Sequence, residues 1–232
     1  MRSIIQVVLA GCVTSVLLAA PPGATSSISG TVLGFGGKPV PGVVVSYFEE
    51  PSSSQASALL NGFVRTKPDG TFTISNVGAG KYQICVQAQE MGMLDPCVWS
   101  AKPAVTVAAG ENSTGLRITL QKGAWLKLRL VDPNGFLPGN LNVKPGTQMV
   151  IAARTPSGFL QTTHLVGKDA TGTNLEMLLP TAVPVHLGVF SQMFQCADAN
   201  GTAVGAETAY TVTIPAGQEY YNATFTVTGR NQ

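Results

Sequence analysis

Apolar residues alternate with polar ones along several short segments in the first part of the chain. The clearest segments are residues 28–32, 38–45, 69–74 and 80–86, and Gly, Pro or Asp-Gly stands at each reversal between them. Alternation at every second position, bounded by turn residues, is typical of short antiparallel strands with one buried face. The pattern therefore predicts an all-β protein made of sandwiches.

The same alternation predicts which side chains share a face. Phe72 and Ile74 point the same way as Tyr82 and Ile84 if their two strands pair. Gly70 follows Pro68-Asp69 and is free to take the positive φ that a tight turn requires. We therefore expect a turn at this point.

The second half of the chain repeats the pattern of the first. Four segments recur in the same order at a spacing of about 100 residues. The matched segments are 32–42 with 130–139, 70–77 with 173–180, 82–86 with 185–189, and 106–120 with 213–227. We interpret this repeat as two tandem sandwiches of about seven strands each.

The predicted domain boundaries follow from this repeat and from the N-terminal segment. They are a signal peptide at 1–24, a first sandwich at 25–122 and a second, divergent sandwich at 123–232. The join near Lys122-Gly123-Ala124 is only a few residues long, so the two domains should meet rather than swing freely.

Composition narrows the class of protein. The chain has 232 residues, of which 11% are charged, with 26 glycines and 15 prolines; an average domain has about 25% charged residues. A net charge of +2 is too balanced for a surface that binds phosphates, so nucleic acid is not expected as a partner.

The first 24 residues predict export. A basic start, Met1-Arg2-Ser3, precedes an almost wholly apolar run to Ala20, and small residues at 19, 20 and 24 offer cleavage sites that the pattern leaves open. The run is too short for a membrane span. Leu9-Ala10-Gly11-Cys12 resembles a bacterial lipobox, but the apolar run continues past it, so a lipid anchor at Cys12 is the lesser alternative.

Four motifs carry a resemblance to a known family: Ile28-x-Gly-x-Val32, Lys38-Pro-Val-Pro-Gly42, Asp69-Gly-x-Phe-x-Ile74 and Gly80-x-Tyr-x-Ile-x-Val86. They resemble the carboxypeptidase regulatory-like domain, well over 26–122 and loosely over 124–230. The resemblance implies transthyretin-like or immunoglobulin-like sandwiches in an exported bacterial protein, secreted, periplasmic or at the cell surface. It also implies a structural appendage with no peptidase active site, metal or cofactor.

Three cysteines remain after the predicted signal peptide. Cys85 and Cys97 flank a short loop, and in an oxidising compartment they are expected to form a disulfide that closes it. Cys196 then has no local partner, and the pattern leaves open whether it is free, buried or intermolecular.

Residues for catalysis are sparse. The two histidines, His164 and His186, lie in strand-like runs and are expected to face solvent. The sequence holds none of the common nucleophile, metal-protease or phosphate-loop motifs. Asp198–Thr202 is predicted to be a turn rather than a calcium loop. We therefore predict that the protein is not an enzyme.

Three further residues are candidates for a covalent cross-link between strands. Related bacterial surface sandwiches form Lys–Asn isopeptide bonds promoted by an acidic residue, and Lys127, Glu176 and Asn222 lie on suitable strands. Their neighbours Leu126 and Leu128 occupy the buried phase, so these polar side chains are predicted to point outward, away from the apolar setting that the reaction needs.

Two main functions remain, beside a third in which the protein is an accessory to an enzyme on a separate chain. The first is a non-enzymatic structural or interaction module of the bacterial envelope or exterior, whose partner is an unidentified envelope protein. The alternative is a carbohydrate-binding module that stacks a glycan on exposed aromatics. The candidate rings are Trp99, Trp125, Tyr220 and Tyr221. Against this alternative, Trp99 is also suited to packing over the disulfide loop, and Trp125 to covering the domain join.

Overall fold

The computed structural model describes residues 25–51, 61–100, 102–137 and 149–230. The predicted signal peptide, with Cys12, lies outside the described residues. Among the described ones, no helix is long and apolar enough to cross a membrane.

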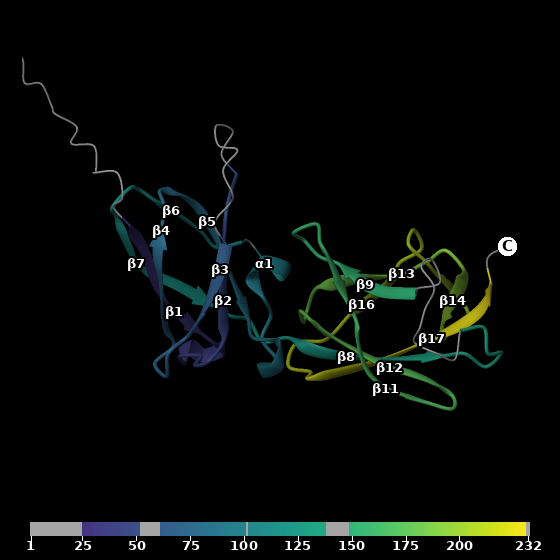
Figure 1. The fold of residues 1–232 in the computed structure, drawn as a ribbon. Helices are drawn as coiled ribbons and strands as arrows, with labels where there is room; N and C mark the ends of the chain where they lie inside the picture. Colours follow the sequence, from purple (N-terminus) through teal and green to yellow (C-terminus); the bar gives the residue numbers. More distant parts are fainter. Residues whose placement is uncertain (1–24, 52–60, 101, 138–148, 231–232) are drawn as a thin grey trace, which may run out of the picture.

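The first sandwich consists of two sheets, ordered β4-β1-β7 and β3-β2-β5-β6, with one short helix, α1 (Figure 1). The elements are β1 (Ser26–Leu33), β2 (Val44–Glu49), β3 (Asn61–Arg65), β4 (Thr71–Val77), β5 (Gly80–Gln87), α1 (Pro96–Trp99), β6 (Ala104–Val107) and β7 (Asn112–Thr119). Short 3-10 turns lie at Phe35–Gly37 and Gln89–Met91.

The second sandwich has the same plan with two additions. Its sheets are ordered β10-β9-β13-β16 and β11-β12-β8-β17-β14-β15. The strands are β8 (Ala124–Val131), β9 (Met149–Arg154), β10 (Leu160–Thr162), β11 (His164–Asp169), β12 (Gly172–Leu179), β13 (Pro184–Ser191), β14 (Phe194–Asp198), β15 (Ala203–Val204), β16 (Tyr210–Thr213) and β17 (Tyr220–Arg230).

The two strand orders correspond one to one. The trio β4-β1-β7 matches β12-β8-β17, and β3-β2-β5-β6 matches β10-β9-β13-β16. The additions are β11 beside β12 and the pair β14-β15 beside β17. The interpretation of the chain as two tandem sandwiches is therefore confirmed.

Both sandwiches also contain a parallel pair, which the prediction of antiparallel strands did not include. The first and last strands of each repeat, β1 with β7 and β8 with β17, run side by side in the same direction. Alternating side chains look the same in either direction, so the sequence pattern carries no information on this point.

The expected face of Phe72 and Ile74 needs a correction. Their strand β4 pairs with β1, not with β5, so Phe72 and Ile74 reach Tyr82 and Ile84 from the opposite sheet. All four side chains are almost fully buried in the first core. The predicted turn at Gly70 is confirmed, with φ at 76°.

Candidate functional site

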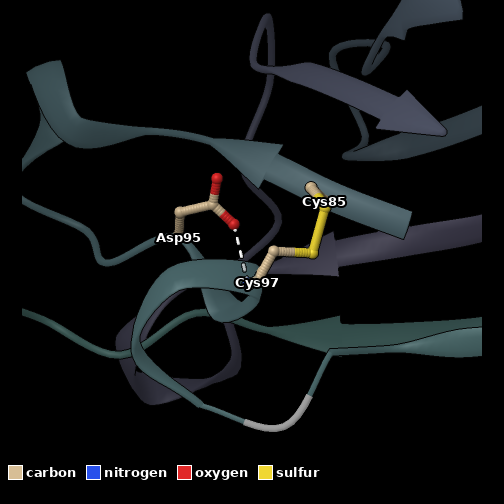
Figure 2. Close-up of side chains that lie close together, drawn as sticks. All are labelled: Cys85, Asp95 and Cys97. Atoms are coloured by element: carbon tan, nitrogen blue, oxygen red, sulfur yellow. Dashed lines mark hydrogen bonds between the residues drawn. A yellow bond between two sulfur atoms is a disulfide. The ribbon is translucent and has the colours of Figure 1, made fainter. Parts of the chain in front are cut away.

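The predicted disulfide is present and fastens α1 to the first sandwich. Cys85 lies on β5 between the core residues Ile84 and Val86, and therefore points away from the core. Its sulfur is bonded to that of Cys97 in α1, with the two Cα atoms 5.4 Å apart (Figure 2). The bond holds the helix against the outer face of β5.

Asp95 starts this helix. Its Oδ1 accepts a hydrogen bond from the backbone N–H of Cys97 at 2.8 Å, and Pro96 occupies the first turn (Figure 2). An acidic N-cap followed by Pro is a common helix start, so the Asp95-Pro96 pair was a signal for α1 that the alternation pattern did not reveal. Burial raises the pKa of the Asp95 carboxyl, and backbone N–H groups of Cys97 and Val86 oppose the shift.

The ligand atoms of Cys85, Asp95 and Cys97 lie within 4.8 Å of one another, as a metal site would require. Metals bind cysteine as the thiolate. Both sulfurs are shared in the disulfide, so this trio serves as a covalent clamp and a helix cap.

The clamped segment enters the second sandwich. Leu94 and Trp99, on either side of Asp95 and Cys97, belong to the buried core cluster that also holds Leu126 of β8. Trp99 is only 9% exposed. Its ring therefore offers no face to a ligand, which corrects its place among the candidate glycan-stacking aromatics.

Polar contacts reinforce this junction. Lys122 Nζ lies 2.6 Å from Glu219 Oε1, and the hydroxyl of Ser157 donates to the backbone carbonyl of Val98 at 2.9 Å. The ammonium of Lys102 lies 4.5 Å from the ring centre of Phe159. The two sandwiches therefore meet through packed side chains, hydrogen bonds, one ion pair and one cation–π contact, with α1 between them (Figure 1).

A cavity of about 600 Å³ opens beside the junction. Arg65 and Glu90 of the first sandwich line it, together with Asp95 and with Gln161 of β10 in the second. The guanidinium of Arg65 already donates to the backbone carbonyl of Gly42 at 2.8 Å. The cavity is polar and mixed in charge.

Trp125 and Tyr220 lie together on the outer face of the second sandwich. They are direct neighbours in the parallel register of β8 and β17. Tyr220 is 53% exposed, and Lys127 Nζ lies 4.1 Å from its ring centre. Trp125 is half-buried and meets the ring of His164 edge-on at 5.7 Å.

Tyr221 has the opposite orientation and packs against the core of the second sandwich. Its side chain shares a hydrogen bond with that of Tyr210, whose pKa rises to about 12 mainly through burial and also through this bond. Of the four candidate aromatics, only Trp125 and Tyr220 therefore share an outward face.

The trio considered for an isopeptide bond also lies on this face. The register places Asn222 opposite Lys127 and Lys127 opposite Glu176. Lys127 and Asn222 are exposed and Glu176 is half-buried, so the predicted outward orientation is confirmed. The setting lacks the apolar surroundings that the cross-linking reaction needs.

A hollow of about 360 Å³ lies over the same strands. Lys127, Glu176 and Asn222 line it, as do Asn174 and Val166. This outer face joins polar groups from β8, β12 and β17 in one concave surface, to which β11 adds Val166.

Other sequence candidates have structural roles. Cys196 is a free thiol buried on β14, 3.7 Å from the sulfur of Met149; burial, with a smaller effect from the charge of Asp132, raises its pKa to about 11. Asp198 Oδ1 accepts the backbone N–H of Thr202 in the predicted turn. His186 faces solvent as predicted and lies 2.9 Å from the hydroxyl of Thr211.

Comparison with known families identifies the first sandwich. The family model of the carboxypeptidase regulatory-like domain matches residues 27–121. The predicted resemblance to this family is confirmed over these residues. The match covers less than half of the chain and ends before the second sandwich. Among curated proteins, no sequence match is found.

Solved structures with a similar arrangement are remote in sequence. A streptococcal ancillary pilin is 14% identical, with 88% of this chain covered, 63% of the pilin covered and a TM-score of 0.38. A minor pilin of Streptococcus agalactiae is 12% identical, with 89% of this chain and 97% of the pilin covered and a TM-score of 0.41.

An enzyme is among the similar structures as well. The 3-chlorocatechol 1,2-dioxygenase of Rhodococcus opacus is 12% identical, with 42% of this chain and 59% of the enzyme covered and a TM-score of 0.31. The chain thus spans less than two thirds of the ancillary pilin and of the dioxygenase. Similarity at this level says nothing about function, and the fold assignment rests on the sheets described above.

Proposed function

We propose that the protein is a non-enzymatic structural or interaction module, exported to the bacterial envelope or exterior, in which two sandwiches act as one rigid piece. The observation that carries the proposal is the insertion of Leu94 and Trp99 into the core of the second sandwich. A segment that is covalently clamped to one domain and buried in the next resists bending at the join. Such a rigid module holds the partners at its two ends at a fixed distance and transmits force between them.

Two further features support export. The Cys85–Cys97 bond is of the kind that forms and persists in oxidising compartments. The N-terminal sequence carries the basic and apolar regions of a signal peptide. The bacterial placement rests on the resemblance of the first sandwich to the carboxypeptidase regulatory-like family.

Rigidity and export are tested separately. Small-angle X-ray scattering of the exported protein should fit a single arrangement of the two sandwiches. In the Trp99→Ala variant the fit should require an ensemble. Expression of the full chain in a bacterial host should place it outside the cytosol with Cys85 and Cys97 protected from alkylation. Cytosolic retention with free thiols, or a flexible wild-type chain, would contradict the proposal.

The second candidate function is carbohydrate binding. The observation that favours it is the pairing of Trp125 and Tyr220 on one outward face of the second sandwich, beside polar side chains. An exposed ring next to hydrogen-bonding groups is suited to a sugar, which has both apolar and hydroxyl-bearing edges.

A further inference from the structure

Three rows of side chains cross the outer face of the second sandwich, perpendicular to its strands. The central row holds Asn222, Lys127, Glu176 and His164, one each from β17, β8, β12 and β11. We call this row, with the hollow that Asn222, Lys127 and Glu176 line, the polar trough. Four adjacent strands span about 14 Å.

The two flanking rows give the trough unequal sides. On the side nearer the domain join lie Tyr220 and Trp125. On the other side lie Thr224, Arg129 and Asn174. One side therefore offers aromatic surface and the other offers hydroxyl, guanidinium and amide groups.

The central row retains free hydrogen-bonding capacity. Within the described part of the chain, the amide of Asn222 has no side-chain partner, and Lys127 contacts only the ring of Tyr220. The carboxylate of Glu176 lies 3.8 Å from Nε2 of His164, beyond hydrogen-bond distance. Arg129, in contrast, is occupied by Asp169 and Asn174. The polar groups at the centre of the trough are thus available to a ligand, whereas Arg129 at its edge is already paired.

The order of these groups selects the charge of a ligand. Lys127 is a donor only, Glu176 is an acceptor only, and Asn222 is both. An anion lying along the row gains from Lys127 and is repelled by Glu176, and a cation has the reverse problem. A neutral chain of hydroxyl groups satisfies all three, because each hydroxyl both donates and accepts.

We infer that the polar trough binds a neutral oligosaccharide, laid across the strands with a sugar ring against Tyr220 and its hydroxyl groups on Asn222, Lys127 and Glu176. The hollow of about 360 Å³ and the length of the row suit a short stretch of a glycan chain. This inference rests on the second candidate function and gives it a site and a class of ligand.

The test uses the full chain, expressed with its N-terminal segment and purified. Amide chemical shifts are followed during titration with neutral oligosaccharides (cellohexaose, xylohexaose, maltohexaose and chitohexaose) and with the anionic trigalacturonic acid. We expect saturable shifts at residues of β8, β12 and β17 with at least one neutral oligosaccharide and none with the anion. Shifts confined to another surface, shifts only with the anion, or no shifts at all would overturn the inference.

Variants locate the contacts. Glu176→Gln and Asn222→Ala should each weaken binding at least tenfold, and Tyr220→Ala should do the same by removing the stacking surface. Phe63→Ala removes another exposed ring, on β3 of the first sandwich, and is the matched control that should leave binding unchanged. Unchanged binding in all three trough variants would overturn the inference.

These variants lie far in sequence from Leu94 and Trp99 and leave the junction contacts in place. Scattering and export measurements therefore test the rigid-module proposal independently. A rigid, exported protein that binds no oligosaccharide would contradict the trough alone.

Discussion

Leu94 of the first sandwich and Leu178 of the second both pack against the bare backbone of Gly123. A Cβ atom added to Gly123 would lie 2.9 Å from Leu94 Cδ2 and 2.7 Å from Leu178 Cγ. Both leucines are buried in one core cluster. The link between the domains is thus packed into the core, because the side chains of both leucines contact the backbone of Gly123.

Gly123→Ala tests this close packing. The added methyl group must displace Leu94 or Leu178, and overpacking of this kind costs about 1–3 kcal/mol. We expect a lower urea midpoint with an unchanged m-value. Gly167→Ala is the control for replacing a glycine, because no atom lies within 4 Å of the added group and no positive φ strains it. An equal or greater loss in that control would mean that the junction is not tightly packed.

Trp99→Ala should weaken the coupling between the sandwiches. Truncating a buried Trp costs about 3–5 kcal/mol, and here the cavity opens where the first sandwich enters the second core. Differential scanning calorimetry should show one unfolding transition in the wild type and two in the variant.

Trp125→Ala provides the matched comparison for this variant. It removes the same side chain from a half-buried position on the outer face, so the loss should be smaller and the transition should remain single. Two transitions already present in the wild type would contradict the proposed coupling.

Removal of the disulfide should destabilise the first sandwich. The bond closes a loop with a sequence separation of 12, and in the chain-entropy model a loop of this size contributes about 3 kcal/mol. The Cys85→Ala, Cys97→Ala double variant is therefore expected to unfold at lower urea. A change smaller than that of Cys196→Ala would show that the clamp adds little stability.

Cys196 should make stability depend on pH under alkaline conditions. Its pKa is about 11 in the folded protein and about 8.5 when unfolded. The unfolded chain therefore loses this proton first as pH rises. The stability that the buried thiol of Cys196 contributes is therefore complete below pH 8.5, and it is lost as the pH rises through 11.

Urea unfolding at pH 7, 9 and 10 compares the wild type with Cys196→Ala. The difference in unfolding free energy between the two should shrink as pH rises, while groups common to both cancel. A difference that stays constant would mean that the thiol is not protected by burial. Slow labelling of the native thiol at pH 8 is the accompanying expectation, because thiolate is the reactive form.

Much of the architecture was visible in the alternation of side chains. In β8, the alternation assigned Leu126 and Leu128 to the inner face and Lys127 to the outer face. A shift of the strand by one residue would expose all of its apolar side chains, so only one assignment buries them. The Cys85–Cys97 bond followed from spacing and compartment. The candidate site was harder to predict from the sequence. Trp99 was expected among the candidate ligand-binding rings but is buried. A lone aromatic residue after a turn has no periodicity that would assign its face.

By itself, the sequence determined the two repeated sandwiches, the inward and outward faces of their strands and the disulfide, because these depend on residues close together in the chain. Only the tertiary structure decided that β1 pairs with β7 in parallel, that Trp99 enters the second core, and that Asn222, Lys127, Glu176 and His164 form one row. These relationships join segments far apart in the sequence. They arise from how the sheets close and how the two sandwiches bury their shared apolar surface, which no local pattern of residues specifies.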